Sequence, residues 1–212
     1  MTYSATYVYV LHAIIILMVL GYYFHVRRLK EDIRQKKADM KKLERLASVD
    51  SLTLIYNRHM LDTILMQQIA TAERYRQLLS VVFFDIDRFK EINDRHGHSI
   101  GDDVLVALAE LVAQTVRESD IFGRWGGDEF LIILPESSQK QAQRLVNALE
   151  KKIFDHSFPG VGHVSCSFGM VAYRFGDTMK TLIERADAKL YEVKKHRGAG
   201  TREHLWMINP AA

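Results

Sequence analysis

The chain begins with a long apolar stretch. Residues 1–24 contain no Lys, Arg, Asp or Glu, and residues 7–24 are almost continuously apolar or aromatic. This length suits a helix that crosses a bilayer, and three basic residues follow within the next six positions. A cleaved signal peptide would need a basic start and a small-residue cleavage site, which this stretch lacks. We therefore expect residues 1–25 to form one transmembrane helix, with the rest of the chain in the cytoplasm.

Residues 26–47 place apolar side chains at a seven-residue spacing. One heptad position holds Val26, Ile33, Met40 and Ala47, and the other holds Leu29, Lys36 and Leu43. The spacing predicts a short parallel coiled coil with a charged misfit at Lys36. Because three heptads are marginal alone, we expect a weak homodimer seam. The alternative is a basic helix lying on anionic lipid.

From residue 48 onward, helix-like and strand-like patterns alternate. Helical periodicity predicts helices over residues 60–79, 102–119, 138–153 and 178–195. Apolar runs predict strands at residues 80–85 and 164–173 and a hairpin over residues 121–134. The central order strand-helix-strand-strand-helix-strand predicts an α+β fold, with helices on one face of an antiparallel sheet.

Composition and charge restrict the function only slightly. The 212 residues are 48% hydrophobic and 26% charged, which allows one good-sized domain and an appendage. The net charge is +3, but residues 27–45 alone hold nine basic and four acidic residues, a net of +5. The basic balance therefore belongs to one short segment, and we expect no nucleic-acid partner. The single Cys166 excludes an internal disulfide and a thiolate metal cluster.

The turn of the predicted hairpin carries two carboxylates. Gly126 and Gly127 precede Asp128 and Glu129, between two apolar runs. Glycines let a backbone approach a phosphate closely, and carboxylates bind hard cations. Asp85 ends another predicted strand, so we expect it to meet this turn if the two strands are neighbours. Such carboxylates suit metal-assisted phosphoryl transfer; a solvated turn is the alternative for the turn taken alone.

Five motifs in a fixed order make residues 47–197 resemble the GGDEF family of diguanylate cyclases. They lie at residues 50–58, 84–94, 96–102, 126–130 and 186–191, and the fourth reads Gly-Gly-Asp-Glu-Phe. The resemblance implies a ferredoxin-like palm of the nucleotidyl-cyclase type over residues 48–200, followed by a tail at 201–212. With the apolar N-terminus, it implies a single-pass protein of the bacterial inner membrane whose catalytic domain is cytoplasmic.

The resemblance also implies a reaction. Two GTP molecules would be joined into cyclic di-GMP, with release of two pyrophosphates, by a homodimer in which each domain holds one GTP. Each active site would use two Mg²⁺ ions, or Mn²⁺ in their place. The metal-binding positions of the family match Asp85, the carbonyl of Ile86, Asp128 and Glu129. Its catalytic positions match Asp128, Glu129 and Lys90.

The substrate and product positions are implied in the same way. The positions that contact GTP match Asn93, His98, Asp102, Gly126, Gly127, Lys194 and Arg197. An aspartate such as Asp102 can accept from guanine N1–H and the 2-amino group, which adenine does not present. Arg117 and Asp120 match an inhibitory Arg-x-x-Asp site for the product cyclic di-GMP. The alternative for this pair is an ion pair at a helix end.

The sequence departs from the family pattern in two places. Leu54 stands where the family usually has Gly, and Arg197-Gly198 stands where it usually has Gly-Arg. We expect Asp87 to be structural despite its spacing from Asp85.

A catalytically inactive GGDEF receptor for GTP or cyclic di-GMP is the alternative function, but such a receptor would be expected to lose key carboxylates or lysines. A membrane scaffold would leave the carboxylates unexplained.

Overall fold

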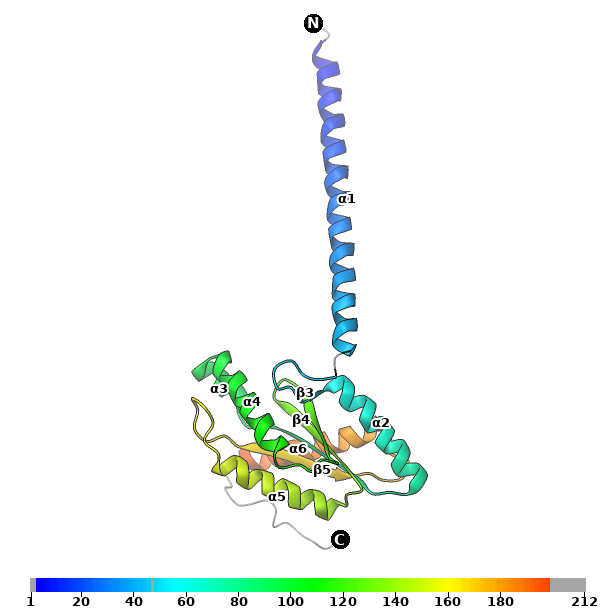
Figure 1. Cartoon of the computed structure of the whole chain (residues 1–212). Helices are drawn as coiled ribbons and strands as arrows, with labels where there is room; N and C mark the ends of the chain where they lie inside the picture. The colour runs from blue at the N-terminus through cyan, green and yellow to red at the C-terminus, as the bar shows by residue number, and fades with distance from the viewer. Residues whose placement is uncertain (1–2, 47, 199–212) are drawn as a thin grey trace. The chain divides into compact units, whose positions relative to one another are not determined.

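The computed structural model describes residues 3–46 and 48–198, which belong to two compact units, Met1–Ala47 and Ser48–Ala212 (Figure 1). The first unit is a single helix, α1, over Tyr3–Leu46. It continues without a break through residues 26–46, and the heptad side chains of Leu29, Ile33 and Met40 are exposed. Pairing of this helix with a second copy stays a prediction. Ala47 and the expected tail at residues 201–212 lie outside the described residues.

The expected membrane span is contradicted. Among the residues that the structure describes, no helix is long and apolar enough to cross a bilayer. His12 and Gly21 fall within the apolar run, and charged side chains resume at Arg27, which shortens its uninterrupted apolar part. The predictions of a transmembrane helix at residues 1–25 and of a single-pass inner-membrane location are therefore wrong.

The second unit contains one five-stranded sheet and five helices in its described residues. Its elements are β1 (Tyr56–Asn57), α2 (Arg58–Tyr75), β2 (Leu79–Ile86), α3 (Phe89–His96), α4 (His98–Ala113), β3 (Ile121–Gly126), β4 (Glu129–Pro135), α5 (Gln139–Asp155), β5 (Cys166–Ala172) and α6 (Met179–Gly198). The strand order is β1-β3-β4-β2-β5. The expected strands and hairpin are present, and the arrangement fits the palm that the resemblance implies.

The sheet is mixed, which corrects the prediction of an antiparallel sheet. Strands β2, β3, β4 and β5 form antiparallel pairs, but β1 pairs with β3 in parallel. The two residues of β1 are too few to show a strand pattern in the sequence. They extend the edge of the sheet at β3, directly before α2 begins at Arg58.

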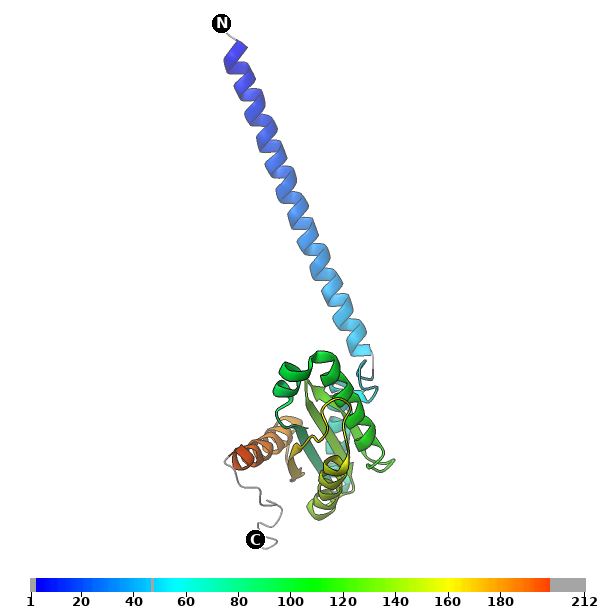
Figure 2. The same cartoon turned by 90° about the vertical axis from the view of Figure 1, so that its left-hand side faces the viewer.

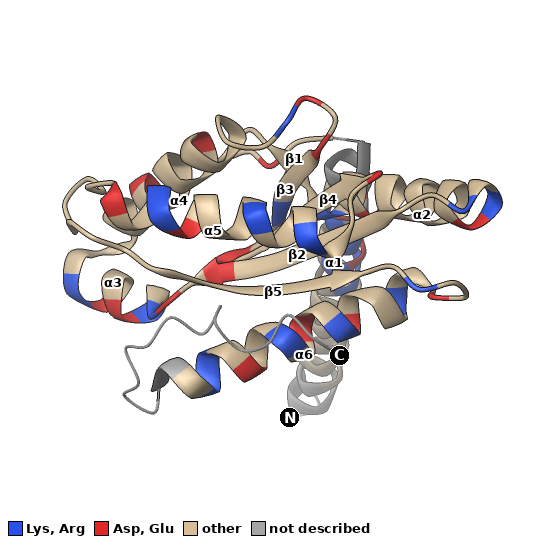
Figure 3. Cartoon of the chain, turned by 90° about the horizontal axis from the view of Figure 1, so that it is seen from below, with Lys and Arg blue, Asp and Glu red and all other residues tan. Residues whose placement is uncertain are grey.

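Helices cover both faces of the sheet, although the sequence pattern predicts only one covered face (Figures 2 and 3). All eight residues of β2 are buried. Val82 and Phe84 belong to the core cluster that includes α4 and α5, whereas Val81 and Phe83 belong to the cluster that includes α2 and α6. A strand that is apolar on both sides needs cover on both sides, and this explains the difference.

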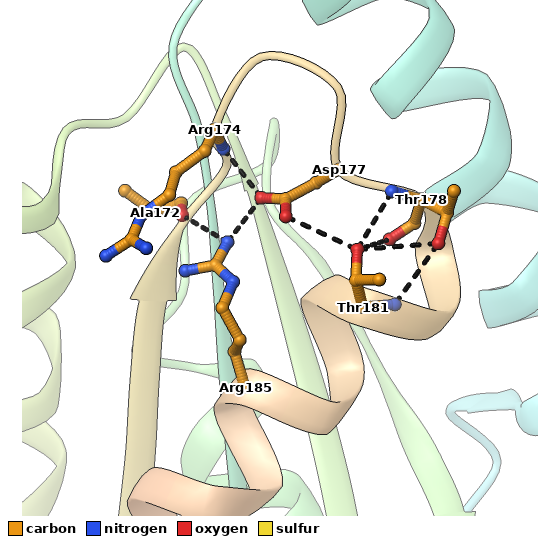
Figure 4. Close-up of polar contacts among 6 residues, drawn as sticks. All are labelled: Ala172, Arg174, Asp177, Thr178, Thr181 and Arg185. Atoms are coloured by element: carbon orange, nitrogen blue, oxygen red, sulfur yellow. Dashed lines mark hydrogen bonds and ion pairs between the residues drawn. The ribbon is translucent and has the colours of Figure 1, made fainter.

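The turn between β5 and α6 is held by a polar network around Asp177 (Figure 4). Asp177 accepts a hydrogen bond from the backbone N–H of Arg174 at 2.7 Å and forms an ion pair with Arg185. Arg185 also donates to the carbonyl of Ala172 at 3.0 Å, and the Thr181 hydroxyl donates to Asp177 at 3.3 Å. The side chains of Asp177 and Arg185 are 12% and 26% exposed. The network therefore joins the end of β5 to the first turns of α6.

We expect Asp177→Ala to lower the free energy of unfolding by about 2 kcal/mol. The change leaves the Arg185 guanidinium half-buried without its anion and removes the acceptor for the Arg174 N–H. Denaturant unfolding of the two proteins measures the difference. Lys180→Ala is the control, because it removes the exposed Lys180–Glu184 pair and should change the unfolding free energy little. Equal effects of the two changes would show that the network does not stabilise the domain.

Candidate functional site

The end of β2 meets the hairpin turn at one edge of the sheet, as the sequence predicts. In the antiparallel pairing of β2 with β4, Asp85 lies opposite Glu129. Gly127 and Asp128 connect β3 to β4, and Gly127 has a φ of +56°. A Cβ added at Gly126 or Gly127 would meet no atom within 4 Å. The backbone of the turn is therefore open to the close approach of a ligand.

Asp85 has the environment of a carboxylate that binds a cation. The residue is 3% exposed, its Oδ2 accepts a hydrogen bond from Lys194, and its Oδ1 is buried with no hydrogen-bond partner. Burial, together with the charges of Asp128 and Asp87, raises its pKa to about 6 against the opposing effect of Lys194. A buried polar atom without a partner is costly, so a cation at Oδ1 would satisfy an atom that the protein alone leaves unpaired.

Glu129 lies opposite Asp85, and these two residues together with Asp128 are called the acidic edge. Burial raises its pKa, and the charges of Asp128 and of Asp187 on α6 raise it further. Glu129 and Asp187 line a cleft of about 250 Å³ together with Trp125. Like charges this close disfavour full ionisation, so added positive charge would stabilise the edge.

The carboxylates do not form a complete metal site by themselves. Within the described residues, no group of three or more His, Cys, Asp or Glu side chains could hold a metal ion. Mg²⁺ in phosphoryl-transfer sites is commonly held by one or two carboxylates together with substrate phosphates and water. Asp85, Asp128 and the carbonyl of Ile86 fit that kind of site, in which the substrate supplies further oxygens.

Lys194 is the basic side chain that reaches this edge from α6. Burial opposes its charge, but the hydrogen bond to Asp85 and the charges of Asp85, Asp128 and Asp87 outweigh burial, so its pKa is raised. Lys194 also lines a groove of about 610 Å³ with Arg88, Arg95 and His163. The side chain of Arg197 lies outside the described residues.

Asp87 contacts β5 and the residue just before it. Its carboxylate accepts hydrogen bonds from the hydroxyls of Ser165 at 2.5 Å and Ser167 at 2.6 Å. Its backbone N–H also donates to the carbonyl of Ser165. These contacts support the structural role that the sequence interpretation gives it.

The predicted guanine-binding residues lie on α3 and at the beginning of α4. Asn93 Oδ1 is buried with no hydrogen-bond partner, and a Cβ added at Gly101 would come within 1.9 Å of that atom. Gly101 therefore allows α4 to approach Asn93 closely. His98 and Asp102 occupy the first turns of α4 and are exposed. Lys90 is also exposed, in the first turn of α3.

Arg117 and Asp120 form a turn between α4 and β3. Asp120 Oδ2 accepts from the backbone N–H of Arg117 at 2.9 Å, and the Asp120 N–H donates to the Arg117 carbonyl at 3.0 Å. The carboxylate is therefore bonded to the backbone of Arg117. Among the described ion pairs, none joins their two side chains, so the helix-end ion pair is not the contact that the structure has.

Arg124 is a residue of this site that the sequence interpretation does not identify. Its Nε–H donates to the carbonyl of Gly127 at 2.8 Å, and its Nη1 pairs with Asp50 at 3.1 Å. Burial alone would raise the pKa of Asp50, but hydrogen bonds from Thr53 and Arg124 lower it overall. Arg124 thus connects the acidic turn to the first residues of the domain. Its position two residues before the paired glycines is the sequence signal for this role.

A comparison with protein families matches residues 47–199 to the model described as "Diguanylate cyclase, GGDEF domain". Among curated proteins, Diguanylate cyclase DgcM of Escherichia coli K12 is 34% identical over 167 residues, which are 77% of this chain and 40% of that protein. Diguanylate cyclase DosC of the same strain is 36% identical over 162 residues, 74% of this chain and 35% of that protein. The chain thus spans less than half the length of these relatives.

Solved structures show the same similarity. The GGDEF domain of DgcB from Caulobacter crescentus, in complex with c-di-GMP, is 28% identical with a TM-score of 0.69, covering 71% of this chain and 91% of that chain. Diguanylate cyclase SiaD from Pseudomonas aeruginosa, in complex with its activator SiaC, is 28% identical with a TM-score of 0.68, covering 91% and 78%. The active GGEEF domain of a Vibrio cholerae diguanylate cyclase is 34% identical with a TM-score of 0.63, covering 66% and 91%.

Proposed function

The chain belongs to the GGDEF family of diguanylate cyclases, and from this membership we propose that it condenses two GTP molecules into cyclic di-GMP and two pyrophosphates. The observation that carries the proposal is Asp85, whose buried and unpaired Oδ1 lies at the sheet edge that bears Asp128 and Glu129. A purely structural domain would have no use for a costly acidic edge of this kind.

The residues at this edge have separate roles in the proposed reaction. Asp85, the Ile86 carbonyl, Asp128 and Glu129 would hold two Mg²⁺ or Mn²⁺ ions. Bound divalent cations neutralise phosphate charge and favour deprotonation of an attacking hydroxyl. Asp128 accepts the proton of the ribose 3′-hydroxyl, with Glu129 beside it. Lys90 and Lys194 neutralise charge on the triphosphate, and the open backbone of Gly126 and Gly127 lets the nucleotide lie against the turn.

The guanine base is assigned to polar side chains of α3 and of the first turns of α4. Asn93 offers an unpaired buried oxygen there, and Asp102 and His98 lie on the adjoining turns of α4. An amide oxygen and a carboxylate are acceptors for the N–H groups of guanine. This supports GTP, rather than ATP, as the substrate.

A symmetric product made from two nucleotides requires two domains face to face. Each domain has one acidic edge and one set of base-binding residues, so a homodimer is part of the proposal. The heptad positions from Val26 to Leu43 lie within α1 and would supply a seam on which two copies can pair. Arg117 and Asp120 are assigned to the inhibitory site for cyclic di-GMP.

Incubation of the purified chain with GTP and Mg²⁺, followed by chromatography and mass spectrometry, tests the proposal. We expect cyclic di-GMP and pyrophosphate in a ratio of about one to two, and neither when the metal is chelated. GTP binding without any product would instead identify an inactive receptor. The absence of both binding and product would contradict the assignment of the site.

We expect Asp102→Ala to reduce the preference for GTP over ATP. Loss of the carboxylate removes a charged hydrogen bond to guanine, which corresponds to a loss of about ten- to a hundredfold in kcat/KM for GTP. Competition assays with both nucleotides measure the preference. Asp103→Ala, on the next residue of α4 and also exposed, is the control and should behave as the parent protein. An unchanged preference in Asp102→Ala would place the base pocket elsewhere.

Product inhibition should depend on the guanidinium of Arg117. We expect Arg117→Ala to weaken cyclic di-GMP binding by at least about tenfold, because a donor suited to phosphate or guanine is lost. Calorimetric titration with cyclic di-GMP measures the affinity. Arg144→Ala removes another exposed arginine, on α5, and should leave the affinity unchanged. Equal affinities in all three proteins would show that Arg117 and Asp120 only form a turn.

A further inference from the structure

Lys194 and Asp85 form an ion pair at the centre of the site, although 109 positions separate them in the sequence. The Lys194 ammonium bonds Asp85 Oδ2, while Asp85 Oδ1 stays buried and unpaired. The Asp85 side chain is 5% exposed, whereas that of Lys194 is 43% exposed. One partner is therefore fixed within the sheet, and the other is a long side chain with access to solvent.

We propose that, without metal, the Lys194 ammonium supplies the positive charge beside Asp85 that a divalent cation supplies later. Binding of the cation to Asp85 then releases Lys194 toward the nucleotide phosphates. The inference rests on the function proposed above and extends it to the order in which charges move within the site. Before the exchange, Lys194 competes with the metal ion for Asp85. It becomes a ligand of the nucleotide only after the exchange.

Charge repulsion makes the two states mutually exclusive. An ammonium bonded to a carboxylate oxygen lies within a few ångströms of any cation bound to the same carboxylate, and like charges at that distance repel strongly away from bulk water. Asp85 cannot move away, because β2 pairs with β4 and β5 on both of its sides. Lys194 can move, because its flexible stem carries a point charge at a partly exposed position.

The exchange links metal binding to nucleotide binding. A cation that arrives without nucleotide must displace Lys194, and a nucleotide that arrives without cation must withdraw Lys194 from Asp85. When both bind, Lys194 exchanges one anionic partner for another, and Asp85 receives the cation. Each ligand therefore makes binding of the other more favourable, which is positive coupling between the two sites.

A titration of the full chain with Mn²⁺ in the absence of nucleotide tests the proposal, with binding monitored by electron paramagnetic resonance. We expect Lys194→Met to bind Mn²⁺ at least about tenfold more tightly than the parent protein, because a competing charge in direct contact is removed. Lys194→Arg keeps the charge and should bind as weakly as the parent. Lys195→Met is the matched control, since its ammonium lies over the Tyr191 ring at 4.6 Å, and it should change the affinity by no more than about twofold.

A second measurement follows the linkage itself. We expect Mn²⁺ to raise the affinity for a non-hydrolysable GTP analogue by a larger factor in the parent protein than in Lys194→Met. Equal Mn²⁺ affinities of the parent and of a folded Lys194→Met, or an equal factor in both, would overturn the exchange. Asp85→Asn separates this failure from failure of the proposed function: undiminished Mn²⁺ binding by Asp85→Asn would show that the metal site itself lies elsewhere.

Discussion

Asp128→Asn should reduce cyclic di-GMP formation by at least about a thousandfold, since it removes both a proposed base and a proposed metal ligand. Asp128 lies in the tight turn between β3 and β4, next to Gly127 and Glu129. Asparagine has nearly the same shape, so the turn can persist without the charge. The product assay with GTP and Mg²⁺ measures the loss, and circular dichroism checks that the variant is folded.

The same variant should be at least as stable as the parent protein. The Asp128 charge raises the pKa of both Glu129 and Asp85, so its removal relieves repulsion at the acidic edge. Asp155→Asn, at the exposed end of α5, is the control and should keep full activity. Normal turnover by a folded Asp128→Asn protein would sink the proposed mechanism, whereas inactivity with a lower melting temperature would indicate a structural role.

Much of the fold follows from local patterns in the sequence. The apolar residues 81–84 within β2 and the paired glycines of the hairpin are strong signals of a buried strand and a tight turn. The short helix α3 gives no such signal, because its eight residues include only two apolar ones, Phe89 and Ile92, which are too few to show a helical period. Cover on both sides of β2 could have been expected from its four consecutive apolar residues, 81–84.

The error at the N-terminus has a different cause. The expected span rests on the length of an almost continuously apolar run and on the basic residues that follow it. His12 and Gly21 fall within that run. Over the described part of α1, no segment meets the length and apolar character that a span needs.

The candidate site could be predicted where residues are close in sequence and not where the fold joins distant segments. The carboxylates of the turn are adjacent, and their proximity to Asp85 required only that two strands be neighbours. The contact between Lys194 and Asp85 depends on how α6 crosses the sheet, so no local pattern reveals it. Tertiary packing alone creates it.

Leu54 shows how a departure from the family pattern is accommodated. Leu54 has a φ of +58°, a left-handed conformation that glycine adopts without strain and that costs another residue about 1–2 kcal/mol. The turn keeps its backbone hydrogen bonds, from Leu54 N–H to the Asp50 carbonyl at 2.9 Å and from Asp50 N–H to the Ile55 carbonyl at 2.8 Å. The contacts of Asp50 are therefore retained despite the missing glycine.

These contacts lead to the last prediction, which concerns Arg124. We expect Arg124→Ala to lower kcat by about a hundredfold with a much smaller change in KM. Arg124 fixes the carbonyl of Gly127, the residue before Asp128, and a displacement of about 1 Å in a catalytic group can cost that much. The guanidinium itself is engaged with protein atoms on two sides, so its loss should act on position and not on substrate binding.

Two further variants separate the parts of this contact. Arg124→Lys can keep the charge pairing with Asp50 but cannot donate to Asp50 and to the Gly127 carbonyl from one rigid fork, so we expect only partial recovery of kcat. Asp50→Asn removes the anion while leaving the Arg124–Gly127 hydrogen bond available, and its kcat should fall less than that of Arg124→Ala. Steady-state kinetics of the three variants give the order. An unchanged kcat in Arg124→Ala would mean that the turn holds Asp128 in place without Arg124, since the two glycines and the β3–β4 pairing would then be sufficient.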